Sequence, residues 1–578
     1  MSKKFLYPFV LLVFMLQFQI LLSQIKNSTY PQNYFRSPLD IPLLLSGNFG
    51  ELRNNHFHAG IDIKTQGVEG QKVRVAANGY VSRIKVQIYG YGKVVYVTHP
   101  NGYTTVYAHL KSFNEGITKV VRKEQYQRES YTLDIDLDSN QIQLKKGDLL
   151  ALSGNSGGSG GAHLHFEIRE TESEIPVNPL LFNFTITDNI PPKVKGVMVY
   201  PMGINSFVNG EKKPLFIKTT KVGSRYKVAV PVNVSGQVAI GLQTNDYLNK
   251  SNNRCGVYDI LMTVNGEKVY QYRTEKISFD ETRYLNAHCD YSYKKKTGKW
   301  IHKIYTLPND QLAIYPLMVD NGIVTTIKDS IYNVQVKLKD VYQNSATLSL
   351  TLKGVAKPAV FLKKSDSLVV KGFSYNTDNE YSVDDFKIYH PKGSFYNDID
   401  FKFYQTKSNF FLSNLNHVHS HTTPLHKKAT MSIKCNDKWN EKVDDTDKLV
   451  VVRKQGKQKS YLTANYINGW VNFKSRYFGT FYLDKDTVAP KIKNVNVFAG
   501  KNLSAQKTIV FRITDDKSGV TVYRGQINGK WVLFEYDYKK AKLTYVIEDN
   551  IRPGKNKLEL LVKDAVGNEK VYKCNFSY

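Results

Sequence analysis

Short runs in which apolar and polar residues alternate recur along most of the chain, separated by Gly, Asn and Pro. In residues 103–110, for example, Val106, Ala108 and Leu110 face one side, whereas Tyr107 and His109 face the other. Side chains alternate between the two faces of a strand, so this period of two predicts β-strands. The 39 Tyr and 29 Phe residues favour strands as well. The pattern therefore predicts a mainly β protein.

Recurring phrases divide the chain into units. With 578 residues it is too long for one hydrophobic core, and we expect roughly three or four domains. The phrases DNIPPKV at 188–194 and DTVAPKI at 486–492 are typical of linkers that lead into a strand, because proline keeps the preceding residue extended. Turn phrases recur as DVYQN at 340–344 and DAVGN at 564–568, with DYLN at 246–249 as a near relative.

These phrases predict two β-sandwich domains with immunoglobulin-like spacing of strands and turns, at 187–355 and 486–578. Residues 356–485 show the same alternation without the repeated turn phrase, and predict a β domain of unassigned topology.

The first residues predict export. Lys3 and Lys4 precede an apolar stretch at 5–22 that ends at the small residue Ser23, an order typical of a secretory signal peptide at 1–23. An uncleaved membrane anchor is the alternative, although Pro8, Gln17 and Gln19 weaken the stretch as a spanning helix. We therefore expect the N-terminal segment to engage the membrane only for export or as an anchor.

The charge balance predicts an anionic partner. Lys and Arg total 80 against 51 Asp and Glu, which gives a formal net charge of +29. The basic residues run along the whole chain without a nucleic-acid-binding motif, so we expect no nucleic acid partner; an anionic cell wall or lipid surface fits equally well. The four cysteines are widely spaced, which favours simple burial, with a Cys255–Cys289 disulfide as the alternative.

Chemistry-bearing residues concentrate before residue 187, on the polar faces of three strand-like segments. In chain order these faces carry His58 and Asp62, then Tyr107 and His109, then His163, His165 and Glu167. Neutral imidazole and carboxylate groups are zinc ligands, and three protein ligands leave one position for a water whose pKa falls to roughly 7. The residues thus predict a zinc centre but do not show which histidines bind metal and which transfer protons.

In their order along the chain, these segments resemble the lysostaphin-type zinc metalloendopeptidases, which are cell-wall hydrolases. The resemblance runs from about residue 45 to 170. It rests on Phe49-Gly50, His58-x-x-x-Asp62, YAHL at 107–110, KGD at 146–148, LSGN at 152–155 and HLHFE at 163–167.

This resemblance implies an antiparallel β metallopeptidase domain at 24–186 with a groove for an extended peptide. It implies one Zn²⁺ ion bound by His58, Asp62 and His165, and His109 and His163 as the catalytic pair. No HExxH glutamate is present, so the two histidines must do the acid–base work. The segment between Leu110 and Gln143 is longer than the resemblance implies and predicts an inserted hairpin near 111–142.

The leading functional hypothesis is a zinc endopeptidase that cuts cross-links or stem peptides of bacterial peptidoglycan, in the periplasm or at the cell surface. The alternative is a non-catalytic envelope protein that binds wall peptides or activates another hydrolase; a secreted toxin is a third candidate. For the C-terminal β modules the sequence leaves three roles open, which are to position the active site, to bind envelope proteins or to occlude the groove until assembly.

Other motifs favour structural roles. The acidic run from Asp134 to Asp138 fails as an EF-hand, because Ser139 and Lys145 stand where Gly and Glu are needed. The Gly-rich run at 153–161 lacks the Gly-Lys-Ser/Thr of a phosphate loop. We expect structural or surface roles for the remaining motif histidines, which are His56, His99, His417, His419, His421 and His426.

Overall fold

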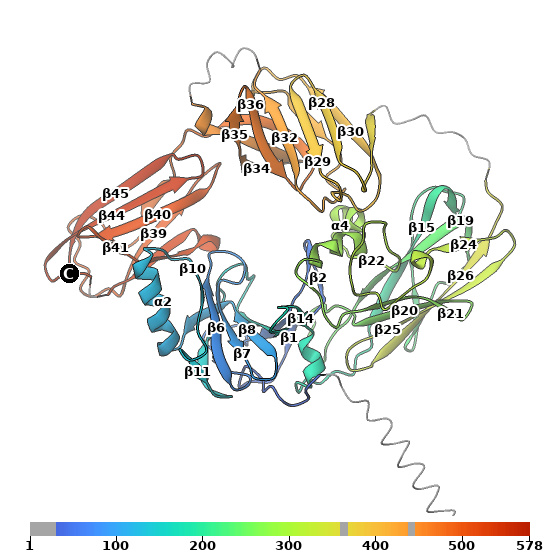
Figure 1. Cartoon of the computed structure of the whole chain (residues 1–578), viewed down its shortest axis with the longest axis horizontal. Helices are drawn as coiled ribbons and strands as arrows, with labels where there is room; N and C mark the ends of the chain where they lie inside the picture. Colours follow the sequence, from blue (N-terminus) through green and yellow to red (C-terminus); the bar gives the residue numbers. More distant parts are fainter. Residues whose placement is uncertain (1–29, 359–367, 437–444, 549) are drawn as a thin grey trace, which may run out of the picture.

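The computed structural model describes residues 30–358, 368–436, 445–548 and 550–578. The predicted signal peptide at 1–23 lies outside these residues. Strands dominate the described chain, which confirms a mainly β protein; its α-helices are α2 (Glu115–Gln127), α3 (Leu285–His288) and α4 (Tyr291–Thr297). None of these helices has the length and hydropathy that crossing a bilayer requires. Figure 1 shows the strands gathered into units around a ring, with the C-terminal unit returning to lie beside α2.

The N-terminal unit, residues 30–186, is built on an antiparallel sheet. A smaller sheet, β5 (Lys72–Arg74), β12 (Leu149–Ser153) and β9 (Leu110–Phe113), accompanies it. Apolar side chains such as Ile61, Ile63 and Phe166 are fully buried, as the alternation predicts. In spatial order the main sheet consists of β1 (Leu45–Gly47), β4 (Ile61–Lys64), β13 (His163–Glu170), β8 (Tyr103–Ala108), β7 (Lys93–Thr98), β6 (Gly79–Val86) and β10 (Leu133–Asp136).

The hairpin expected near 111–142 is wrong, because the segment forms helix α2 and then strand β10. The side chain of Asn114 caps the helix by accepting the Ile117 N–H at 2.9 Å. Ile117, Val121 and Gln125 recur every fourth residue and are buried together, which is a helical period. Strand β10 then pairs with β6 at the edge of the main sheet. The insertion therefore extends the domain's core and is not a free flap.

The second unit, residues 187–355, has its main strands hydrogen-bonded into one continuous sheet, in which β19 and β26 run parallel. An immunoglobulin-like domain has two separate sheets, so that topology stays a prediction here. The order is β16 (Leu215–Lys218), β15 (Lys193–Val208), β19 (Val232–Asn245), β26 (Ser345–Gly354), β25 (Ile331–Lys339), β20 (Asp259–Val264), β21 (Glu267–Arg273) and β23 (Leu317–Met318).

The two remaining units each contain a pair of sheets, as β-sandwiches do. In the third unit one sheet is β27 (Val369–Phe373), β30 (Ile399–Thr406), β31 (Leu415–Val418), β37 (Gly479–Lys485), β33 (Leu449–Gln455) and β34 (Gln458–Thr463). The other is β28 (Asn379–Val383), β29 (Phe386–His390), β32 (Ala429–Lys434), β36 (Trp470–Ser475) and β35 (Asn465–Ile467). The sheets of the C-terminal unit are β38 (Lys491–Asn494), β39 (Thr508–Thr514), β43 (Lys542–Val546) and β42 (Phe534–Asp537), and β41 (Lys530–Val532), β40 (Val520–Ile527), β44 (Lys555–Asp564) and β45 (Glu569–Ser577).

All four cysteines are free and buried, so the alternative Cys255–Cys289 disulfide is not formed. Cys289, Cys435 and Cys574 act as small apolar side chains in the cores of their own units, whereas Cys255 packs into the core of the N-terminal unit.

A buried histidine pair in the second unit predicts loss of stability in acid. His288 Nε2 lies 3.0 Å from His302 Nδ1, and burial lowers the pKa of His302 to about 4. Its unfolded pKa is about 6.5. The unfolded chain therefore binds the extra proton, so this stabilisation is complete above pH 6.5 and is lost as the pH falls toward 4. At pH 5, His302 should lower the free energy of unfolding by about 2 kcal/mol.

Calorimetric unfolding at pH 7 and pH 5 measures this effect, with His302→Gln as the comparison. The wild-type chain should lose more stability than the variant over this interval. An equal loss in both would show that His302 does not carry the acid sensitivity.

Candidate metal centre

Two neighbouring strands bring the predicted metal ligands together. Strands β4 and β13 pair antiparallel, with Asp62 directly opposite His165. Opposite residues project to the same face of a sheet, so these two side chains meet. His58 lies just before β4, after β3 (His56–Phe57), and His109 directly follows β8, the other neighbour of β13. All five predicted site residues therefore lie at one face of the main sheet.

Three ligand atoms form a nearly equilateral triangle. The Nε2 atom of His58 lies 3.1 Å from Asp62 Oδ1 and 3.0 Å from His165 Nδ1, and the last two atoms are 2.9 Å apart. All three residues are buried, and they form one of the groups of the described chain whose spacing suits a metal ion. Tetrahedral zinc with ligands at about 2.0–2.1 Å separates its ligand atoms by roughly 3.3 Å. The residues present thus fit a zinc ion.

Hydrogen bonds on the far side of each ring direct its lone pair into this triangle. His58 Nδ1 donates to the carbonyl oxygen of Asn48 at 2.7 Å, which leaves Nε2 as the free acceptor. His165 Nε2 donates to Glu167 Oε1 at 2.8 Å, which leaves Nδ1 free. Metal-binding histidines commonly donate their second N–H to a carboxylate or carbonyl group in this way.

The carboxylate of Glu167 is held ionised behind His165. Burial favours its neutral form, but the charge of Arg169 and the hydrogen bond from His165 lower the pKa of Glu167 to about 2. Arg169 Nε donates to Glu167 Oε2 at 2.7 Å, and the Tyr91 hydroxyl donates to Oε1 at 2.5 Å. Strand alternation in the sequence correctly predicted the face on which Glu167 lies. It did not predict that Tyr91 and Arg169 bond Glu167, because the fold brings these side chains together.

We expect Glu167→Gln to weaken zinc binding by about 10–100-fold, because the amide is a weaker acceptor and His165 loses its fixed orientation. Competition against a chromophoric zinc chelator measures the affinity. Glu170→Gln is the matched control, since Glu170 stands at the end of the same strand and bonds Lys276. Equal affinities in the two variants would show that Glu167 does not support the centre.

Arg53 is a further site residue that the sequence did not predict. Its Nη2 lies 2.6 Å from Asp62 Oδ2 and 3.3 Å from Glu51 Oε2. The guanidinium thus hydrogen-bonds Asp62 Oδ2, which leaves Asp62 Oδ1 as the ligand atom of the triangle. Burial opposes protonation of His165, yet its hydrogen bonds to Asp62 and Glu167 raise its pKa to about 9, whereas burial lowers the pKa of His58.

His163 and His109 flank the triangle with their rings side by side. Their ring centroids are 4.9 Å apart, and His163 Nε2 lies 3.4 Å from Asp62 Oδ1. His163 Nδ1 bonds the Gly161 carbonyl at 2.9 Å, and His109 Nδ1 bonds the Ser156 carbonyl at 2.9 Å. Burial, followed by the nearby His165 and His163, lowers the pKa of His109 to about 3, so its ring is neutral at neutral pH.

The other histidines lie away from this centre. His56 is exposed, and His99 is buried between Asn78 and Thr105, as expected. Within the described ranges, none of the four histidines between 417 and 426 belongs to a group with metal-ligand spacing. His417, for example, bonds Thr406 and Thr480.

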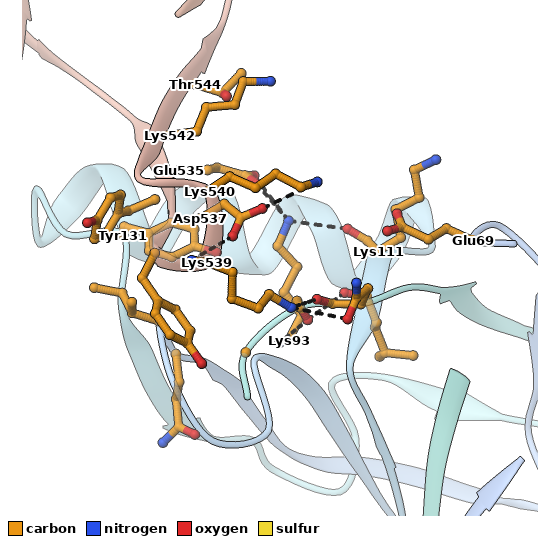
Figure 2. A pocket seen from close by; sticks show the side chains of 18 residues that line it. Glu69, Lys93, Lys111, Tyr131, Glu535, Asp537, Lys539, Lys540, Lys542 and Thr544 are labelled. Carbon is orange, nitrogen blue, oxygen red and sulfur yellow. Dashed lines mark hydrogen bonds and ion pairs between the residues drawn. The ribbon is translucent and has the colours of Figure 1, made fainter. Parts of the chain in front are cut away.

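Both neighbouring units support loops of the site. Gly256 of the second unit exchanges two hydrogen bonds with the side chain of Asn48, whose carbonyl orients His58. From the C-terminal unit, Lys539 Nζ donates to the Ser159 carbonyl at 3.1 Å, and Ser159 Oγ contacts His163 Nδ1 at 3.1 Å. Figure 2 shows Lys539 and Lys93 at this interface, around a pocket that none of the five site residues lines.

Comparisons with known proteins find matches to two parts of the chain. Residues 56–128 match peptidase family M23, and residues 370–486, which cover most of the unassigned β domain, match the Zu5-like domain. The DD-carboxypeptidase/endopeptidase Mpg of Neisseria meningitidis serogroup B is 31% identical over 123 residues, which are 21% of this chain and 22% of that protein. An uncharacterized metalloprotease of Haemophilus influenzae is 29% identical over 161 residues, 27% of this chain and 28% of that protein.

Both relatives are thus matched over less than a third of their length. Among solved structures, the catalytic domain of the antimicrobial peptidase lysostaphin from Staphylococcus simulans is 20% identical, with a TM-score of 0.18; the match covers 23% of this chain and 87% of that one. The sequence match therefore shows a peptidase family M23 region at residues 56–128 of this chain.

Proposed function

We propose that this protein is a zinc-dependent endopeptidase that hydrolyses peptide bonds in bacterial peptidoglycan. The observation that carries the proposal is the triangle of His58 Nε2, Asp62 Oδ1 and His165 Nδ1, with each histidine lone pair directed inward by a hydrogen bond. Such a set of donors at the polar face of a peptidase-family sheet supports a metal-dependent hydrolase.

The residues around the triangle have the properties that hydrolysis needs. Bound zinc would supply the Lewis acidity that polarises a peptide carbonyl and activates water. His109 donates its Nδ1 proton to Ser156, so its Nε2 atom is a neutral base that accepts a proton from the attacking water. His163 is partly exposed beside Asp62 and is positioned to contact the carbonyl oxygen, and protonated His109 would return to the leaving amine the proton that it took from water.

Charge and export support a wall substrate. A formal net charge of +29 favours an anionic polymer, and Mpg, a partial relative, is named for carboxypeptidase and endopeptidase activity. We place the mature protein in the periplasm or at the cell surface, on the basis of the predicted signal peptide at 1–23 and of this substrate. Binding of envelope proteins by the C-terminal modules remains part of the proposal.

Digestion of defined peptidoglycan fragments tests the function. The purified mature chain is incubated with them, and new amino and carboxyl termini are identified by mass spectrometry. We expect new termini from stem or cross-link peptides, their loss with a zinc chelator, and their return when zinc is restored. If zinc-loaded protein retained the fragments without cutting them, the non-catalytic alternative would replace the proposal.

A further inference from the structure

Three aspartates meet where the second unit joins the peptidase domain. Asp188 lies in the linker before β15, Asp246 directly follows β19, and Asp340 directly follows β25. One carboxylate oxygen of each lies within 4.8 Å of those of the other two. Asp246 and Asp340 are each only 3% exposed, and Asp188 is half-buried. Residues far apart in the chain thus converge on one small acidic cluster.

This cluster has no basic partner. Across residues 30–358, 368–436, 445–548 and 550–578, no lysine, arginine or histidine forms a salt bridge with Asp188, Asp246 or Asp340. The chain carries 80 Lys and Arg against 51 Asp and Glu, so basic residues are not scarce. Burial, followed by the charges of Asp340 and Asp188, raises the pKa of Asp246 to about 8. Buried carboxylates this close repel each other unless a cation or proton neutralises them.

One oxygen of the cluster lacks a hydrogen-bond donor. Asp246 Oδ1 is buried and, within the described chain, has no partner. The Asp340 carboxylate, by contrast, accepts the Asn344 backbone N–H at 2.9 Å and the Asn344 side chain at 2.6 Å. A buried polar atom without a partner is destabilising, and therefore points to a ligand supplied from outside the chain.

The same arrangement is built a second time in the C-terminal unit, where the linker enters it. Carboxylate oxygens of Asp486, Asp515 and Asp564 also lie within 4.8 Å of one another. The Asn568 side chain donates to the Asp486 carbonyl at 2.8 Å and to Asp564 Oδ2 at 2.7 Å. Asn344 donates to the Asp188 carbonyl at 3.2 Å and to Asp340 Oδ2 at 2.6 Å in the corresponding way. The recurring sequence phrases therefore encode a shared three-aspartate junction.

We propose that Asp188, Asp246 and Asp340 bind a divalent cation, and that the cation is Ca²⁺. The ligands are oxygen atoms only, which Ca²⁺ prefers, whereas zinc takes nitrogen and sulfur more readily. Backbone carbonyls and water complete a coordination shell of 6–8 oxygens around such an ion. A bound ion ties the linker at Asp188 to the ends of β19 and β25 and fixes the second unit against the peptidase domain.

Calcium titration of the full mature chain tests this site. Protein with its zinc restored is cleared of calcium and titrated with CaCl2 alone, using isothermal titration calorimetry and thermal unfolding. Calcium sites of extracellular modules have dissociation constants of roughly 10⁻⁴ to 10⁻³ M, which sets the range to be covered. We expect the wild-type chain to bind Ca²⁺ and to unfold at a higher temperature with it. The Asp246→Asn variant should bind one ion fewer.

Asn is similar in shape to Asp and removes a buried charge, so Asp246→Asn should fold without calcium at least as stably as the wild type. Asp188→Asn, at the half-buried position, serves as a second variant. Asp280→Asn is the matched control, because Asp280 is an exposed aspartate of the same unit; it should keep the wild-type number of ions.

Absence of Ca²⁺ binding by the wild type at calcium on the order of 10⁻² M would overturn the proposal. Unchanged ion counts in Asp246→Asn and Asp188→Asn would overturn it as well, and would leave a shared proton as the neutralising group. The result is independent of the peptidase proposal, since His58→Ala should bind as much Ca²⁺ as the wild type.

Discussion

Replacement of any one of the three triangle residues, as in His58→Ala, Asp62→Ala or His165→Ala, is expected to abolish zinc binding and lower peptide hydrolysis on the order of 10³-fold. A metal Lewis acid contributes several kcal/mol to the transition state, and each 1.36 kcal/mol is a factor of ten in rate. Metal content by mass spectrometry and the rate of release of new peptide termini measure the two effects.

The neighbouring His56 provides the matched control. It stands two residues before His58 but is exposed, with its ring at the Asn54 carbonyl. His56→Ala should therefore keep full zinc content and activity. Stoichiometric zinc with undiminished activity in His58→Ala would show that the triangle is not the catalytic centre.

Loss of either flanking histidine is expected to lower kcat by about 10²–10⁴-fold while zinc remains bound. His109→Ala removes the neutral base, and His163→Ala removes the ring next to Asp62. Neither side chain contributes an atom to the triangle, so zinc content should stay at one ion per chain. Steady-state rates on a defined wall peptide, with metal content determined on the same samples, separate chemistry from metal loss.

His421→Ala, at a partly buried histidine of the third unit, is the control for changing a histidine elsewhere. It should keep the wild-type rate. A wild-type kcat in both His109→Ala and His163→Ala would remove these residues from the mechanism, and loss of zinc in both would reassign them to metal support.

The faces of the site strands were predictable from the sequence, whereas their meeting was not. Strand alternation put His58 with Asp62 and His163 with His165, because side-chain direction depends only on neighbouring residues. The pairing of Asp62 with His165 is a long-range register, and no local pattern specifies it. Only the resemblance to lysostaphin-type enzymes separated the expected ligands from the catalytic pair.

Two kinds of feature could not be predicted from the sequence: a helix whose apolar pattern is short, and contacts between residues far apart in the chain. Only Ile117, Val121 and Gln125 of α2 are buried, and the residues between them are mostly polar or charged, so the apolar pattern of this helix is too short to identify it. Arg53, Tyr91 and Arg169 act on the site through side-chain contacts that only the fold creates. The hydrogen bond from Lys539 to the Ser159 carbonyl joins residues 380 positions apart, so no local sequence pattern predicts it either.

The repeated aspartate phrases show the same limit. Their Asp and Asn residues correctly predicted turns, since such side chains bond nearby backbone groups. The convergence of Asp188, Asp246 and Asp340 on one point follows from the sheet order, which places the ends of β19 and β25 beside the linker. A turn signal is local, whereas a ligand set is a property of the assembled unit.

Anomalous diffraction from crystals of the full mature chain, recorded on both sides of the zinc absorption edge, would locate the zinc ion directly. We expect one zinc peak at bonding distance from His58 Nε2, Asp62 Oδ1 and His165 Nδ1. A zinc-loaded crystal whose peak lay elsewhere, or whose His58 and His165 rings pointed away from a common atom, would contradict this expectation.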